Sequence, residues 1–364
     1  MSDDRLLSFV NAVSGDDFLK VEESFGGGFV RLRVAEAERR QARHDIRFTE
    51  DIVLEMLRNS RDAGARVIFV ATTRHDNMRS LVFVDDGEGI PEDMHDKVFE
   101  ARVTSKLESV HMDSWGIHGR GMALYSIREN ARTARVAASE PGKGSAFVVE
   151  VDLDTLSERS DQSTYPLLVT DEEGRRRIAN GPHNIIRTVL EFALEHPDLD
   201  VYLGSPSEVC ATMLQLGRDH LAQLHPSFSQ LVSEDLDEVP LYARTALAGD
   251  AAELAEQASR LGIELSERTA RRVLDKTVHA LSPALSKVTP ASPSLSDAKI
   301  KADPYKDNRG LKLSREDVKA FQSALEQAFM PLGERYYLSL AGRPSVRVQG
   351  SAIHVRFDIE HDDD

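Results

Sequence analysis

The chain has 364 residues, and at roughly 100–200 residues per domain this length predicts two or three domains with cores of their own. Its 61 Asp and Glu residues outnumber 45 Lys and Arg residues, and the formal net charge of -16 disfavours a general nucleic-acid coat or a binder of anionic membranes. One cysteine, Cys210, excludes a disulfide framework and a multi-cysteine zinc site, and the lack of a signal peptide and of an apolar run of roughly 20 residues leads us to expect a cytoplasmic protein.

The first 155 residues alternate between helical patterns and paired strand-like runs. The expected elements are a half-exposed strand at 30–34, helices at 35–43 and 49–59, strands at 67–72 and 81–84 joined by a polar hairpin loop at 73–80, a helix at 122–132, and strands at 134–139 and 146–153. This order of helices, hairpin, helix and hairpin differs from the regular βαβ alternation of a doubly wound fold. It predicts the α+β class and a two-layer α/β sandwich.

The rest of the chain predicts smaller units. Helical patterns at 185–194 and 208–224 flank a short strand at 201–203, and a final helix at 314–330 precedes a hairpin. We therefore expect a first domain at 1–155, a smaller α/β region at 156–235, a helical segment at 236–285, a linker at 286–310, and a C-terminal helix plus β-hairpin at 311–364.

The helix expected at 49–59 carries a column of polar side chains. At 100° per residue Glu55, Asn59 and Asp62 share one face, and the apolar Met56 and Leu57 point away from it. An amide oxygen is a suitable ligand for Mg²⁺, and a carboxylate one turn away can deprotonate an attacking water. An amphipathic helix with a solvated polar face gives the same pattern, so this helix alone leaves both interpretations open.

An acidic, glycine-containing turn, DDGEGI at 85–90, follows a strongly apolar strand. The carboxylate of Asp85 can accept a hydrogen bond from an exocyclic amine such as that of adenine. Gly87 and Gly89 lack Cβ atoms, so a flat base can lie against the backbone. An ordinary Asp-Gly turn is the alternative.

A glycine-rich loop, GIHGRGM at 116–122, opens directly into a helix, and a helix N-terminus offers free N–H groups and a positive dipole end to phosphates. Lone loops of this kind are often only turns. Before it lies an irregular polar segment, 100–115, with VTSK at 103–106, which has the composition of a mobile lid. A later hairpin turn, 139–147, places Ser145 where it could support the contact made by Asp85.

The order and spacing of these motifs resemble the ATP-binding domain shared by gyrase B, the heat-shock chaperone of ninety kilodaltons, histidine kinases and MutL, known as the Bergerat or GHKL fold. The resemblance covers about 45–153, roughly a third of the chain. Glu55 to Asn59 is similar to the N box, Asp85 to Gly89 to the adenine-binding box, Gly116 to Met122 to the lid glycine box, 139–147 to the last hairpin of histidine kinases, and 59–65 and 104–106 to MutL.

The resemblance implies ATP and Mg²⁺ as cofactors, Glu55 as general base and Asn59 as the Mg²⁺ ligand. It implies Asp85 as the adenine-binding carboxylate, a phosphate cradle around the glycine loop, and Lys106 as a phosphate or lid contact. The expected nucleotide-binding residues are Asn59, Asp62, Asp85, Gly87, Gly89, Ile90, Thr104, Lys106, Gly116, Gly119, Arg120, Gly121, Met122 and Ser145.

Three functions are compatible with these residues. The first is an ATPase that acts as a conformational switch on a protein partner or a second protomer, with nucleic acid as an open possibility and no membrane expected. The second is a protein kinase of the histidine-kinase type, and the third is an ATP-binding regulator without hydrolysis. Histidine kinases typically lack the glutamate at the head of the N box, so Glu55 favours hydrolysis. His44 lies 11 residues before Glu55, too close for a separate phosphoacceptor helix pair, and we expect it to be structural.

Overall fold

The computed structural model describes residues 21–26, 28–34, 36–105, 111–113, 116–118, 121–159, 161–170, 176–224, 239–287, 315–336, 338–349 and 352–361. The chain forms two compact units, residues 1–291 and 292–364. Within the described ranges, no helix has the length and apolar character needed to cross a membrane.

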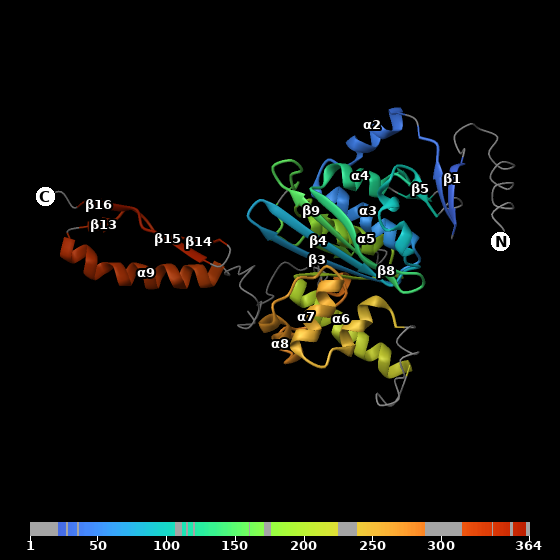
Figure 1. Cartoon of the computed structure of the whole chain (residues 1–364). Helices are drawn as coiled ribbons and strands as arrows, with labels where there is room; N and C mark the ends of the chain where they lie inside the picture. Colours follow the sequence, from blue (N-terminus) through green and yellow to red (C-terminus); the bar gives the residue numbers. More distant parts are fainter. Residues whose placement is uncertain are drawn as a thin grey trace. The chain divides into compact units, whose positions relative to one another are not determined.

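A five-stranded mixed sheet forms the centre of the first unit (Figure 1). Its strand order is β12 (Asp200–Gly204), β3 (Val67–His75), β4 (Met78–Asp85), β9 (Gly144–Asp152) and β8 (Thr133–Glu140). β12 lies parallel to β3, and all other neighbours pair antiparallel. The hairpins β3–β4 and β8–β9 are the two that the sequence predicts, and β12 adds an edge strand from far along the chain.

The first hairpin is longer than expected, and the prediction of a polar loop at 73–80 was wrong. Pairing between the strands continues to His75 opposite Met78, so only Asp76 and Asn77 form the turn. Asp76 has a φ of 51°, a conformation that Asp and Asn accept in two-residue hairpin turns. The apolar residues identified only the buried half of the hairpin. The half near the turn is more exposed and polar, and its strands are held together by backbone hydrogen bonds that leave no apolar pattern in the sequence.

Alternate strand residues point to opposite faces of the sheet, as the period of two requires. One face is covered by α3 (Thr49–Asp62), α4 (Ala123–Asn130) and α5 (Ile185–Glu195), and α2 (Glu36–Asp45) contacts α4 (Figure 1). The sheet residues in this core include Ile68, Val70, Leu81, Phe83, Phe147 and Val149. Helices packed on a mixed sheet agree with the predicted combination of helices and strands. The two-layer arrangement predicted for it is not found, because helices from later in the chain also cover the opposite face.

The opposite face is covered by α6 (Pro206–Leu224), the 3-10 helix η6 (Leu241–Leu247), α7 (Ala251–Arg260) and α8 (Glu267–Leu274) (Figure 1). The rings of Tyr202 and Tyr242 lie 5.4 and 5.3 Å from the ring of Phe69 in β3. Helices on both faces explain why β3 and β4 contain nearly continuous apolar runs, since both sets of side chains are buried.

The remaining elements of the first unit are short. They are a three-stranded sheet of β1 (Val21–Gly26), β2 (Phe29–Leu32) and β5 (Val103–Thr104), the pairs β6 (His111–Asp113) with β7 (Gly116–His118) and β10 (Leu167–Thr170) with β11 (Arg176–Asn180), and the 3-10 helices η2 (Glu92–Met94), η3 (Lys97–Phe99) and η7 (Ala284–Lys287).

The second unit contains α9 (Arg315–Tyr336), the strand pair β13 (Leu338–Leu340) with β16 (Ile359–His361), and the hairpin β14 (Ser345–Gln349) with β15 (Ala352–Arg356). Phe329 of α9 stacks on Phe357 with ring centroids 5.5 Å apart. The linker expected at 286–310 lies almost entirely outside the described residues.

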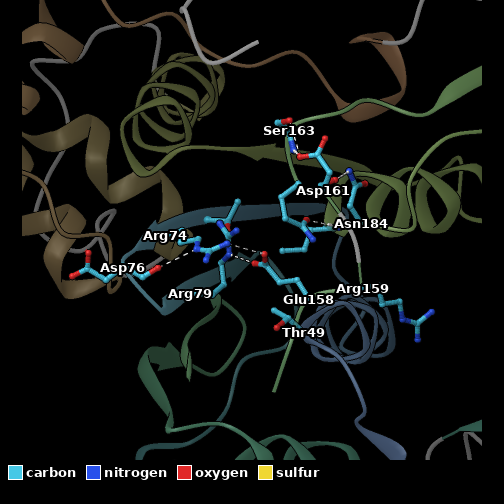
Figure 2. A network of polar contacts seen from close by, with 12 residues as sticks. Thr49, Arg74, Asp76, Arg79, Glu158, Arg159, Asp161, Ser163 and Asn184 are labelled. Atoms are coloured by element: carbon cyan, nitrogen blue, oxygen red, sulfur yellow. Dashed lines mark hydrogen bonds and ion pairs between the residues drawn. The ribbon is translucent and has the colours of Figure 1, made fainter. Parts of the chain in front are cut away.

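A polar network ties the segment after β9 to the sheet and to α5 (Figure 2). Glu158 accepts a hydrogen bond from Nε of Arg79 at 2.6 Å and lies 3.6 Å from Nη1 of Arg74. The side chain of Asn184 caps α5 and donates from Nδ2 to the carbonyl of Asp161 at 2.7 Å. These contacts fix the path of the chain from β9 to α5, which leads on to β12.

Gly262, between α7 and α8, is held against the sheet. Its φ is +80°, and a Cβ atom there would lie 2.2 Å from Cγ2 of Val148 in β9. We expect Gly262→Ala to lower the free energy of unfolding by about 2–4 kcal/mol, because the left-handed backbone and the overpacking both destabilise an alanine. Urea denaturation followed by circular dichroism measures the loss. Gly249→Ala is the control, since its Cβ would meet only the flexible Glu253 carboxylate, at 3.3 Å. Equal losses in the two variants would contradict this account.

Candidate nucleotide-binding site

A pocket of about 710 Å³ lies beside α3 and the start of α4, on the face of the sheet that these helices cover. Its walls also include the turn after β4 and residues 102–105. Ten predicted site residues line it: Glu55, Asn59, Asp62, Asp85, Gly89, Ile90, Thr104, Gly121, Met122 and Ser145. Gly87 and Gly116 are not among the described lining residues, and Lys106, Gly119 and Arg120 lie outside the described residues.

The helix α3 presents its polar column to the pocket because its ends and its apolar face are fixed. The carboxylate of Asp51 accepts hydrogen bonds from the backbone N–H groups of Arg47 and Phe48, at 2.9 and 3.0 Å, where the helix begins. Gly64, with a φ of +71°, follows the last turn. With Met56 and Leu57 buried in the core, Glu55, Asn59 and Asp62 face the pocket.

A buried arginine, Arg58, belongs to the same face of α3. Its side chain is 4% exposed, it lines the pocket, and its Nη1 donates to Oε1 of Glu55 at 2.6 Å. The next arginine, Arg61, pairs with Asp62 at 2.8 Å and does not line the pocket. Arg58 was missed in the sequence, although its position three residues after Glu55 places it in the polar column.

The carboxylate of Asp85 is 2% exposed at the end of β4. Its Oδ2 accepts a hydrogen bond from the Ser60 hydroxyl at 2.8 Å, and its Oδ1 accepts one from the backbone N–H of Gly87 at 3.0 Å. Burial raises the pKa of Asp85 to about 6, and the two hydrogen bonds oppose that rise. The site therefore contains one desolvated acceptor, the carboxylate of Asp85. The sequence analysis did not predict Ser60 as one of its hydrogen-bond donors.

Ser145 lies opposite Asp85 in the β4–β9 ladder and also lines the pocket. Its hydroxyl lies 2.8 Å from that of Ser139, which accepts a hydrogen bond from the backbone N–H of Ile90 at 2.7 Å. A chain of hydroxyls thus connects the strand end, the hairpin and the turn. Ser139 is a further member that the sequence analysis left without a role.

The glycines of the turn at 85–90 have intramolecular reasons to be glycine. A Cβ on Gly87 would lie 2.8 Å from the carbonyl oxygen of Ala63, at the end of α3. Gly89 has a φ of +70°, and its Cβ would lie 1.9 Å from the carbonyl oxygen of Glu140 in the β8–β9 hairpin. Close approach of these two neighbours explains both positions without any bound base.

The β8–β9 hairpin is anchored from the opposite layer. Nη1 and Nη2 of Arg244, in η6, donate to the two carboxylate oxygens of Glu140 at 2.5 and 2.7 Å, and Lys143 donates to Glu140 at 2.7 Å. These hydrogen bonds lower the pKa of Glu140 to about 2, with that from Arg244 the largest cause. Because the N–H of Gly142 also donates to the carbonyl of Glu88 at 2.6 Å, the turn beside Asp85 rests on this hairpin.

Thr104, Gly121, Met122 and the first residues of α4 also line the pocket. Gly121 has a φ of +66°, and its carbonyl accepts the N–H of Arg102 at 2.8 Å. The expected loop at 116–122 is partly a strand, because Gly116–His118 forms β7 and pairs with β6. Among the described residues of this motif, Gly121 and Met122 line the pocket.

The donor set suits a metal ion held largely by a polyphosphate. Among the described residues there is no cluster of three or more His, Cys, Asp or Glu that could hold a metal by itself. The Nδ2 atom of Asn59 is buried and makes no hydrogen bond with the described part of the chain. Asn59 lines the pocket. Its Nδ2 is a donor, which suits a phosphate oxygen, and the Oδ1 atom of the same amide is the one that would serve as a single protein ligand to Mg²⁺, with the remaining ligands from phosphates and waters.

Comparisons with known proteins agree with this geometry. Residues 44–155 match the family described as histidine kinase-, DNA gyrase B-, and HSP90-like ATPase. The DNA mismatch repair protein MutL of Thermus thermophilus, in two strains, is 30% identical over 206 residues, which cover 54% of this chain and 36% of MutL. MutL of Thermus aquaticus is 28% identical over 192 residues, covering 51% and 35%. The chain spans about a third of the length of these curated relatives.

Two solved structures are also similar. The mycobacterial sensor histidine kinase MprB has 24% identity and a TM-score of 0.21, over 32% of this chain and 87% of that chain. Full-length ShkA in complex with AMPPNP has 15% identity and a TM-score of 0.22, over 55% and 46%.

The raised pKa of Asp85 makes a prediction about folding. Because the pKa is about 6 in the folded chain and 3.8 without burial, the ionised carboxylate destabilises the fold above pH 6. That penalty disappears as the pH falls through 6 toward 4. Asp85→Asn cannot ionise, so we expect its stability relative to the wild type to be greatest near pH 7.5 and to decline as the pH is lowered across this window. Urea denaturation of both proteins at several pH values measures the difference, and a difference independent of pH would contradict the shifted pKa.

Proposed function

We propose that this chain, whose residues 44–155 belong to the GHKL superfamily of histidine kinase-, DNA gyrase B- and HSP90-like ATPases, binds Mg-ATP and hydrolyses it. The observation that carries the proposal is one pocket whose lining combines Asp85 and Ser145 with Gly121, the start of α4 and the Glu55–Asn59 column. A buried acceptor for the base and a helix N-terminus for the phosphates are the two kinds of contact that a nucleotide needs.

Asp85 accepts the hydrogen bond of the adenine amino group in this proposal. Its oxygens are held in place by Ser60 and Gly87, so the acceptor is oriented before the ligand arrives. Ser145, next to it in the ladder, supports the same edge of the base. The match between a fixed acceptor and an exocyclic amine favours adenine over a base with a carbonyl at that position.

Glu55 acts as the general base for hydrolysis. Its carboxylate takes a proton from a water molecule as the water oxygen bonds to the γ-phosphorus, and the bond from that phosphorus to the bridging oxygen of ADP breaks. Asn59, one helical turn away, would hold Mg²⁺, which neutralises charge on the phosphates when it is bound. The polar column on α3 brings these two groups to the same pocket.

ATP binding and release then act as a switch on a protein partner or on a second copy of the chain. The similarity to MutL covers only about a third of that protein, so the proposal concerns the ATPase module alone. Transfer of phosphate to another protein is the competing outcome.

Asp85→Ala should weaken ATP binding by about tenfold to hundredfold, because it removes a buried, charged hydrogen-bond acceptor. Isothermal titration calorimetry at pH 7.5 measures the dissociation constant. Glu88→Gln is the control. Glu88 is exposed in the same turn and lines the pocket, so this substitution removes one negative charge from the lining and leaves the carboxylate of Asp85 in place. An unchanged affinity in Asp85→Ala would remove Asp85 from the binding site.

Glu55→Ala should reduce phosphate release by about 10²–10⁴-fold, the usual contribution of a general base, while ATP still binds. Incubation with γ-labelled ATP separates the three functions. Release of free phosphate by the wild type supports the ATPase, labelled protein supports a kinase, and neither product supports a binding protein without hydrolysis. Hydrolysis by Glu55→Ala at the wild-type rate would mean that another group is the base.

A further inference from the structure

We propose that Arg58 senses the terminal phosphate of the bound nucleotide: the guanidinium that pairs with Glu55 in this structure transfers to the γ-phosphate of ATP and releases Glu55 to the attacking water. This inference rests on the proposed function, because it assumes that ATP occupies the pocket. Three observations support it: the burial of Arg58, its place along α3, and the charge of the pocket lining.

The burial of Arg58 requires a permanent anionic partner. With 4% of its side chain exposed, the guanidinium lacks the hydration that an exposed arginine has, and a buried charge without a partner is strongly destabilising. Glu55 is such a partner, at 2.6 Å. A phosphate oxygen can replace that carboxylate without leaving the arginine desolvated and uncompensated, since guanidinium groups bind phosphates as well as carboxylates.

The position of Arg58 along α3 directs its guanidinium to the phosphate end. Ser60 marks the base end, because its hydroxyl bonds Asp85. Glu55 precedes Ser60 by five residues, which at 1.5 Å per residue is about 7.5 Å along the helix axis. Helix side chains lean toward the N-terminus. The ion pair shows that the Arg58 guanidinium lies beside Glu55, which is on the side away from the proposed adenine site.

The pocket lining is acidic, which makes each cation in it important for a polyphosphate. The described lining residues include six carboxylates, Asp45, Asp51, Glu55, Asp62, Asp85 and Glu88. Only two described lining residues are basic, Arg58 and Arg102. Arg58 donates a hydrogen bond to Glu55, the proposed general base. Movement of Arg58 onto the nucleotide would both attract the anion and uncover the Glu55 carboxylate. Glu55, the general base, would then be released only when a γ-phosphate is present.

The first test compares AMPPNP with ADP, each with Mg²⁺, by calorimetry. Arg58→Met should weaken AMPPNP binding by about tenfold to hundredfold, as expected for loss of a charge-assisted hydrogen bond, and should change ADP binding far less. Arg58→Lys keeps the charge but not the planar fork, so its loss should be intermediate. Arg61→Met is the matched control on the same helix, and it should leave the ratio of AMPPNP to ADP affinity unchanged.

The second test needs no variant. A crystal structure of the wild-type chain with Mg-AMPPNP should show the Arg58 guanidinium on a γ-phosphate oxygen and separated from Glu55, and the complex with ADP should retain the ion pair. An ion pair that persists with AMPPNP, or equal losses of AMPPNP and ADP affinity in Arg58→Met, would overturn the role of Arg58 alone. If the wild type binds neither nucleotide, the proposed function fails together with this inference.

Discussion

The burial of one face of α3 is the constraint on which the pocket depends. Four apolar residues of this face pack toward the sheet and are at most 1% exposed: Ile52, Val53, Met56 and Leu57. A rotation of the helix would bring these side chains into water, at a cost of about 1.5–3 kcal/mol for each of them. The hydrogen bond from Ser60 to Asp85 fixes the C-terminal half of the helix to β4. The helix can therefore not rotate without loss of stability, and its polar side chains point into the pocket: Glu55, Arg58 and Asn59.

The Asp85 side of the pocket depends on both layers of helices. The turn beside Asp85 contacts the β8–β9 hairpin, and Arg244 and Lys143 hold that hairpin through Glu140. The N–H of Leu241 also donates to the carbonyl of Lys143 at 3.0 Å. The second layer is thus in direct contact with the structure behind the acceptor, so a displacement of η6 would be transmitted to the turn that carries Gly89.

The sequence predicted those parts of the site that depend on local periodicity. Helix geometry predicts that Glu55, Asn59 and Asp62 share one face. The acidic turn was predicted because polar residues and glycines come directly after an apolar strand. Arg58 was not predicted because a charged residue in a helix is usually solvated, and its burial arises from the tertiary structure. Gly87 and Gly89 were predicted as positions without side chains, but the atoms that require this, in Ala63 and Glu140, are brought near only by folding.

The fold was predictable to a similar limit. Each hairpin of the central sheet joins neighbouring segments, and a turn between two apolar runs identifies it. The pairing of β12 with β3 could not be predicted in this way, because Val67 and Asp200 are paired with no local signal between them. The coverage of the second face of the sheet was equally hidden, since a helix pattern does not say which surface its apolar stripe contacts.

The parallel pairing of β12 with β3 has a consequence for biosynthesis. On the ribosome, β3 emerges long before residue 204, and until then its backbone N–H and C=O groups along one edge have no partner strand. Such an edge is a template for pairing with other chains. A nascent or recombinant fragment that stops near residue 155 would retain this open edge and lack α6, whose Met213 and Leu214 lie in the core of the second face. A separate fragment that extends through α6 would keep β12 on this edge and the Met213 and Leu214 side chains on the second face.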